Sequence, residues 1–289
     1  MVSNTIVRTA LGAVWVCSLL ASAPASAGVL AFGPNTDFPD SNQVMPFNQV
    51  GVRQTYLTLS NVGAGPTAAT WAFYDASGAE IIAVDRVILG EGGTDIVDPA
   101  RVRSRNADGQ EGPITDLSGR QGFVVVSAGD GEPRLISNFT IANVASNMAF
   151  GANGIGLGVV GLLAPNALNL GITFDPSTLD DDMLIIVGID DLDAIPTSLT
   201  GGAAPSPGQI VFAANLTLHS NSGDGILASR NLDVNGSAFL SRLSDLFPGA
   251  TLDEPATISV QPTTDGVTSI GWYGQGLGPY GAGQSLRTE

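Results

Sequence analysis

Residues 56–60 read Tyr-Leu-Thr-Leu-Ser, and this alternation of leucine with polar residues indicates the fold class. Successive side chains of a strand point to opposite faces, so the pattern predicts a strand with one buried face and one face in water. Further along, Trp-Ala-Phe-Tyr at 71–74 runs into Asp-Ala-Ser-Gly at 75–78. Because glycine adopts positive φ without strain, these four residues predict a turn that brings 68–75 back against 81–89.

Short runs rich in Val, Ile, Leu, Thr and aromatic residues recur along the whole chain, between 37 glycines and 17 prolines. Such punctuation is typical of an all-β protein. Further turns are expected at 129–131 and 221–225. The expected strands are 55–60, 68–75, 81–89, 94–97, 122–127 and 134–142 in the first half, and 183–188, 209–218, 226–231, 256–260 and 267–272 in the second.

The two halves show the same order of strands and turns at similar spacing. We therefore predict two tandem antiparallel β-sandwich domains, one over 28–165 and one over 166–289. A single large sandwich or barrel that takes strands from both halves is the alternative.

One short helix is expected in the second domain, where it would cover an end or edge of the sandwich. Ser237 can cap it, and Pro248-Gly249 would end it. The apolar residues at helical spacing are Phe239, Leu240, Leu243, Leu246 and Phe247. The polar segment 101–119 holds the matching place in the first half and is expected to be a surface excursion.

Residues 1–27 have the features of a signal peptide. A short n-region ends at Arg8, an apolar stretch covers 9–21, and Ala-Ser-Ala at 25–27 precedes Gly28. The apolar stretch is too short to span a bilayer, and we expect no transmembrane segment after cleavage. The protein is expected to be secreted, extracellular or at the cell surface, with the periplasm as the alternative. The composition suggests a bacterial source.

Composition excludes several kinds of chemistry. The 11 basic residues are all arginine, against 27 acidic residues, one histidine and one cysteine. Cleavage removes Arg8 and Cys17, which leaves 10 arginines, a charge of −17 and no disulfide. Schiff-base lysines and clusters of thiolates or histidines are excluded. So strong a negative charge argues against nucleic acid as a partner, because counterion release needs a cationic surface.

Four segments carry a resemblance to a known kind of domain. They are Tyr56-Leu57-Thr58-Leu59-Ser60-Asn61, Trp71-Ala72-Phe73-Tyr74-Asp75-Ala76-Ser77-Gly78, Gly93-Thr94-Asp95-Ile96-Val97 and Gly122-Phe123-Val124-Val125-Val126-Ser127. This series resembles the strands of immunoglobulin-like domains in bacterial exported and envelope proteins. The resemblance implies two tandem immunoglobulin-like sandwiches that act as spacers, adhesion modules or matrix components, and it supplies no catalytic residue.

Catalytic chemistry finds little support in the residues. His219 is the sole imidazole, follows an apolar strand and is not accompanied by a Gly-x-Ser-x-Gly nucleophile elbow. We interpret it as a histidine in a turn. We therefore expect no enzyme and no catalytic residue, with a hydrolase as the third hypothesis.

Calcium is the one cofactor that the acidic residues suggest. Asp180-Asp181-Asp182 and the group Asp190, Asp191 and Asp193 flank one apolar strand, which separates them by roughly 20 Å. The second group is the candidate metal site, although it lacks the spacing of a known calcium loop. The alternative is that these acids are solvated and deter edge pairing.

Aromatic residues raise the possibility of carbohydrate binding. Alternation places Trp71 and Phe73 on one face, in the core, and Tyr74 on the opposite face. Ile270 and Trp272 are likewise expected in the core, while Tyr56, Tyr74 and Tyr273 are the rings left for a sugar. Three Asn-x-Ser/Thr sequons, at Asn138, Asn215 and Asn235, matter only in a host that glycosylates.

The leading hypothesis is an exported, non-enzymatic structural or adhesion protein of the cell envelope or extracellular matrix. Its expected partners are envelope or matrix proteins or glycans, with self-association as a further possibility. The alternative is a carbohydrate- or calcium-binding accessory module.

Overall fold

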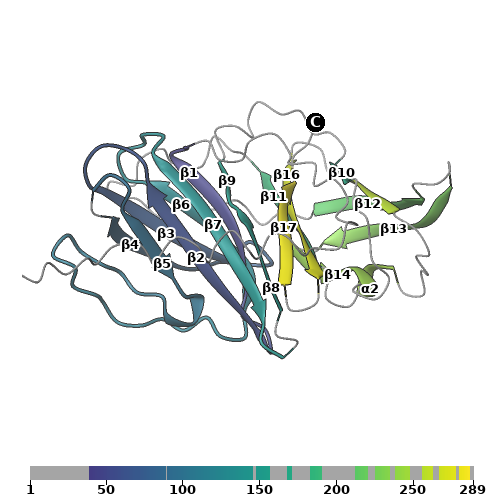
Figure 1. Cartoon of the computed structure of the whole chain (residues 1–289), viewed down its shortest axis with the longest axis horizontal. Coiled ribbons are helices and arrows are strands. Elements are labelled where there is room, and N and C mark those ends of the chain that lie inside the picture. The colour runs from purple at the N-terminus through teal and green to yellow at the C-terminus, as the bar shows by residue number, and fades with distance from the viewer. Residues whose placement is uncertain are drawn as a thin grey trace, which may run out of the picture. The chain divides into compact units, whose positions relative to one another are not determined.

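The computed structural model describes residues 39–88, 90–145, 148–156, 168–170, 183–190, 212–220, 225–234, 238–247, 256–262, 267–277 and 280–286 (Figure 1). Every pair of named strands is antiparallel, so the protein is all-β, as the sequence predicts. Helical structure in the described residues is limited to two single turns, η1 and α2. The signal segment and the expected boundary between 165 and 166 lie outside these residues.

The first half, residues 39–156, contains nine strands and one 3-10 turn. These are β1 (Asn42–Asn48), β2 (Arg53–Asn61), β3 (Thr67–Asp75), β4 (Glu80–Ile88), β5 (Thr94–Val97), η1 (Pro99–Arg101), β6 (Gln121–Ala128), β7 (Leu135–Asn143), β8 (Met148–Asn153) and β9 (Ile155–Gly156). They form two sheets, β4-β3-β6-β1-β9 and β5-β2-β7-β8.

The second half, residues 168–286, contains eight described strands. The strands are β10 (Leu168–Leu170), β11 (Met183–Asp190), β12 (Phe212–Ser220), β13 (Ile226–Val234), β14 (Ala238–Arg242), β15 (Ala256–Pro262), β16 (Val267–Leu277) and β17 (Tyr280–Leu286), and the helical turn α2 (Leu243–Leu246) follows β14. They also form two sheets, β10-β15-β12-β13 and β14-β11-β16-β17.

The two halves share one strand order. If β2 is matched to β11 and the count continues to β8 and β17, the sheet β5-β2-β7-β8 corresponds strand for strand to β14-β11-β16-β17. With β1 matched to β10, β4-β3-β6-β1 corresponds in the same way to β13-β12-β15-β10. Even the helical turns match, because η1 follows β5 and α2 follows β14. The repeat of pattern seen in the sequence is therefore a repeat of topology in the described strands.

A hydrophobic core fills the first half between its two sheets. Alternation along β2 buries Leu57 and Leu59 completely, and Trp71 and Phe73 of β3 are also fully buried. Phe47 of β1 contacts Phe73 edge to face, with ring centroids 5.7 Å apart. This burial supplies the main stabilisation of the sandwich.

The same core continues into the second half. It includes Met183, Ile185, Val187 and Trp272, each at most 3% exposed. Trp272 lies edge to face against Phe139 at 5.7 Å. Its indole Nε1 donates a hydrogen bond of 2.8 Å to the carbonyl of Asn153 on β8. The expected burial of Trp272 is thus confirmed, and the core that it enters is that of the first half.

Strand β11 is covered on both faces. Met183, Ile185 and Val187 point to the first core, whereas Leu184, which alternation places on the other face, is also fully buried. Leu184 lies outside the first cluster, as do buried Leu216 and Leu218 of β12. An apolar strand of this kind is what the continuous run Met-Leu-Ile-Ile-Val predicts.

The helix expected over 237–247 is largely wrong. Residues 238–242 form strand β14, whose backbone pairs with β11 from Met183↔Arg242 to Val187↔Ala238. Only Leu243–Leu246 turn into a helix, α2, in which Leu246 is buried. Pairing at the edge of a sheet satisfies a row of backbone groups, and this tertiary gain overrides helical spacing of the side chains.

The turns predicted at 75–78 and 129–131 are present, whereas residues 221–224 of the third predicted turn lie outside the described residues. Gly78 has φ of 83° and closes the β3–β4 hairpin. Gly131 has φ of 72° and also closes a turn, yet β6 pairs with β1 and β3 while β7 crosses to β2 in the other sheet. The segment 129–131 therefore connects β6 of one sheet to β7 of the other sheet, and these two strands do not pair with each other.

Several strands were not predicted from the sequence. They are β1, β8, β9, β10, β14 and β17. Strand β1 contains Asn42, Gln43 and Asn48, all at most 7% exposed, so polar residues hide its burial from a hydrophobicity pattern. Among the described residues, none of the helices is long and apolar enough to cross a membrane.

Candidate functional site

The sheet β5-β2-β7-β8 presents an outer face to solvent. Its outward side chains alternate with the core residues Leu57, Leu59, Phe139 and Ile141. The outward positions are Gln54, Tyr56, Thr58 and Ser60 on β2, Thr94 and Ile96 on β5, Ile136, Asn138, Thr140 and Ala142 on β7, and Ala149, Gly151 and Asn153 on β8. We call these thirteen residues the outer face.

The outer face has no charged side chain, although the chain has 27 acidic and 11 basic residues. Strand register sets its side chains in rows. One row runs from Ile96 through Thr58 and Asn138 to Asn153, which are directly opposite one another on successive strands. Such neighbours have Cβ atoms about 5 Å apart. The result is a patch of amide and hydroxyl groups with two exposed apolar side chains, Tyr56 at 44% and Ile96 at 64%.

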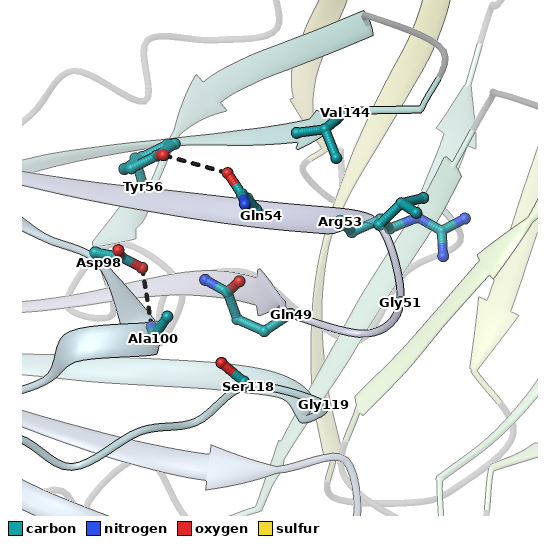
Figure 2. Close-up of a pocket in the computed structure, with 11 residues that line it drawn as sticks. Gln49, Gly51, Arg53, Gln54, Tyr56, Asp98, Ala100, Ser118, Gly119 and Val144 are labelled. Carbon is teal, nitrogen blue, oxygen red and sulfur yellow. Dashed lines mark hydrogen bonds between the residues drawn. The ribbon is translucent and has the colours of Figure 1, made fainter.

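A pocket of about 400 Å³ adjoins the outer face where β2 begins (Figure 2). Its lining combines a guanidinium, a carboxylate, amides, a hydroxyl and the Tyr56 ring. The lining residues are Gln49, Gly51, Val52, Arg53, Gln54, Tyr56, Asp98, Ala100, Ser118, Gly119 and Val144. Gln54 and Tyr56 therefore belong to both the pocket and the outer face.

Local hydrogen bonds fix the pocket wall. Gln49 is 6% exposed, and its side-chain amide donates to the backbone carbonyl of Thr55 at 3.3 Å. The backbone carbonyl of Gln49 accepts from the backbone amide of Gly119 at 2.8 Å. Gly51 has φ of 64°, which a side chain would make strained, and turns the chain from β1 into β2. The Asp98 carboxylate caps η1 by accepting from the Ala100 amide at 2.9 Å, as Figure 2 shows.

The pocket's chemistry is that of hydrogen bonding to a polar ligand. The Tyr56 hydroxyl lies 3.4 Å from the Gln54 amide oxygen, to which it donates (Figure 2). Beside the pocket, hydrogen bonds from the side chain and backbone of Ser118 lower the pKa of the Asp116 carboxyl, so this group stays ionised at neutral pH. Together the donors, acceptors and ring suit a molecule with many hydroxyl groups.

A buried set of charged side chains lies away from the pocket, on β4 and β5, and has a structural role. Arg86 binds Asp95 with two hydrogen bonds of 2.6 and 2.9 Å, and both residues are at most 4% exposed. Arg105 adds a 2.9 Å ion pair to the same carboxylate and donates to the Val87 carbonyl. Since Arg86 also donates to the Arg103 carbonyl, the cluster ties the excursion at 101–119 to β4 and β5.

Two of the three residues of the predicted calcium site lie outside the described residues. Asp190 ends β11, whereas Asp191 and Asp193 lie outside the described residues, so the calcium site stays a prediction. Within the part of the chain that the structure covers, no group of three or more acidic, His or Cys side chains is placed to hold a metal ion. His219 is on β12 beside a register shift and is not in the turn that we expected.

The prediction for Tyr74 is wrong. This residue is fully buried, and its ring stacks on Phe123 with centroids 5.1 Å apart. Strand β6 is buried from Gly122 to Ala128, so both faces of the sheet are covered there, and alternation alone does not reveal this. Burial raises the Tyr74 pKa, with a further contribution from the charge of Glu80. Of the three tyrosines proposed for a sugar, Tyr56 is exposed and Tyr74 is not.

The chain has no match among family models and none among curated proteins.

Most residues of the candidate site were not predicted from the sequence. One signal for it was present, because the alternation in 56–60 predicts that Tyr56 and Thr58 are in water. The contribution of β5, β7 and β8 to the same surface depends on register, which no single segment encodes.

Proposed function

We propose that this protein is an exported, non-enzymatic structural or adhesion component of the cell envelope or extracellular matrix, and that it makes contact through the outer face. The observation that carries the proposal is the absence of charge from all thirteen positions of that face. Contact surfaces are depleted of charged residues at their centre, because each charge costs free energy to desolvate.

The surroundings of the outer face support the proposal. Charged residues of the same sheet are on the inner side or at its ends, and Asp95 is directed inward into the cluster with Arg86. The thirteen positions of the outer face thus carry no charge in a chain whose formal charge is −16. Tandem immunoglobulin-like sandwiches belong to the same proposal. The β2–β5 and β3–β6 pairs agree with that architecture, whereas the β2–β7 pair departs from it.

The second candidate function is a carbohydrate- or calcium-binding accessory module. The pocket with Tyr56, Gln54 and Asp98 favours the carbohydrate form of it. For the calcium form, the test is the melting temperature of the purified chain in millimolar Ca²⁺ and in chelator. If the protein binds calcium, the melting temperature should be higher in Ca²⁺ than in chelator, and Asp190→Asn and Asp191→Asn should remove this increase. No increase in the wild type excludes calcium binding.

Fractionation of the native host tests the main proposal. We expect wild-type protein in the envelope or matrix fraction and Asn138→Asp protein released to the medium, because the substitution places a charge at the centre of the outer face without changing its shape. Asn215→Asp on β12 is the matched control, since Asn215 is also exposed and also begins a sequon. Equal retention of wild type and both variants would contradict the proposed contact surface.

A further inference from the structure

We propose that the outer face binds an uncharged polysaccharide chain and that the adjoining pocket receives one of its sugar residues. This inference rests on the proposed function, for which it names the partner. Its structural basis is the continuity of an uncharged sheet face with a polar pocket through Gln54 and Tyr56.

Charge is the first argument for this partner. A chain of formal charge −16 repels anionic polysaccharides, and a cationic partner would bind better to acidic residues, which the outer face lacks. An uncharged ligand is subject to neither effect. It also leaves no charge unpaired when water is removed from the contact.

Hydrogen-bonding capacity is the second argument. Thr58, Asn138 and Asn153 are adjacent across three strands, with Asn138 exposed and the other two partly exposed. The exposed Asn138 amide offers both donors and acceptors, and the Thr58 hydroxyl offers one donor and two acceptors. Sugar hydroxyl groups have the same dual capacity, so a glycan on this row can satisfy the amides that it covers.

Tyr56 is the third argument. It is the one aromatic residue of the outer face, its ring is 44% exposed, and its hydroxyl is bonded to Gln54. In the next row, Tyr56 is opposite Thr140, and Thr140 is opposite Gly151, where no side chain rises from the sheet. Beside this position without a side chain, the Tyr56 ring offers an apolar surface to the C–H groups of a sugar, and the same ring also lines the pocket.

The second half of the molecule argues against another copy of the chain as the partner. Its equivalent sheet has a covered face, and the residues there are Met183, Ile185, Val187 and Trp272. A protein contact of that kind is apolar and closely packed, as stable interfaces between identical chains are. The outer face of the first half is made mainly of amides and hydroxyls, which favours a hydrated, hydroxyl-rich ligand.

Affinity electrophoresis of the purified full chain tests the inference. The probes are dextran, laminarin and hydroxyethyl cellulose as uncharged polysaccharides and alginate as an anionic one, with pull-down on chitin and cellulose particles. We expect retardation by at least one uncharged polysaccharide and none by alginate. Tyr56→Ala and Asn138→Asp should each weaken binding about tenfold, as loss of a central contact does. Tyr56→Phe keeps the ring and should retain most of the affinity.

Two control variants show whether an effect is specific to the outer face. Asn215→Asp and Ala83→Glu change charge at exposed positions outside the outer face and should bind as wild type does, and circular dichroism with melting confirms that each variant folds. The inference is overturned if no uncharged polysaccharide binds, or if Tyr56→Ala and Asn138→Asp bind as wild type. If envelope retention still depends on Asn138 in that case, the proposed function stands and the partner is a protein or a second copy. A concentration-dependent dimer in sedimentation would identify the latter.

Discussion

The two equivalent sheets of the molecule use their outer faces in opposite ways. In the second half, the sheet β14-β11-β16-β17 directs Met183, Ile185, Val187 and Trp272 into the core of the first half. In the first half, the sheet β5-β2-β7-β8 has the same strand order, and its outer face is in solvent. One topology therefore supports a packed face in one place and a free face in the other.

The difference shows which properties belong to the fold and which to the sequence placed on it. Strand order and register are common to both sheets and set where each side chain points. The choice of residue at the outward positions is independent of them. Apolar residues occur where another sheet covers the face, and mainly amides and hydroxyls where no described strand covers it. The latter face is therefore suited to contact without being an exposed hydrophobic core.

The largest expected effect comes from the covered face. Trp272→Ala removes a fully buried indole, its edge contact with Phe139 and its hydrogen bond to Asn153. We expect the free energy of unfolding to fall by about 4 kcal/mol, measured by urea denaturation. Tyr56→Ala on the free face should cost less than about 1 kcal/mol. Equal losses for the two substitutions would break the comparison between the faces.

The next effect concerns the buried ion pair that links β5, at the edge of the sheet with the free face, to β4. Asp95→Ala leaves the Arg86 guanidinium buried without its carboxylate, and we expect a loss of about 3 kcal/mol in urea denaturation. Asp85→Ala, on the exposed side of β4, is the control and should change stability little. The double variant Arg86→Met with Asp95→Leu should recover much of the loss, because no fully buried charge is left alone and the Arg105 side chain, which also loses its partner, is 26% exposed to solvent. A double variant as unstable as Asp95→Ala would rule out the unpaired charge as the cause.

The smallest effect comes from a buried polar group without a partner. The Tyr74 hydroxyl is buried and has no hydrogen bond, so Tyr74→Phe should leave stability at pH 7 unchanged or raise it by up to about 1 kcal/mol. The Tyr74 pKa is raised in the folded state above its unfolded value of about 10. Its contribution to stability is therefore complete below pH 10 and is lost as pH rises beyond it. Unfolding between pH 8 and 11.5 should show a steeper decline for wild type than for Tyr74→Phe, and parallel declines would contradict the raised pKa.

Some of these residues could be identified from the sequence and others could not. The alternation around Leu57 and Leu59 located β2 and its buried face, and the bounds of β5 were predicted as Thr94–Val97. The burial of Tyr74 was not predicted, because it requires cover on the second face of a sheet. The ion pair of Arg86 with Asp95 joins two strands that follow each other in sequence but lie in different sheets, so no local pattern marks it.

The sequence by itself determined that the chain is all-β, that turns fall at 75–78 and 129–131, and that its two halves repeat one order of elements. These properties are local, since alternation, glycine conformation and the spacing of breakers act within a few residues. Tertiary structure decided that β7 pairs with β2, that residues 238–242 form a strand and that the outer face of β5-β2-β7-β8 is free while its equivalent is covered. Those outcomes depend on backbone pairing and burial between segments far apart in the chain, and the free energy of such contacts exceeds local preference.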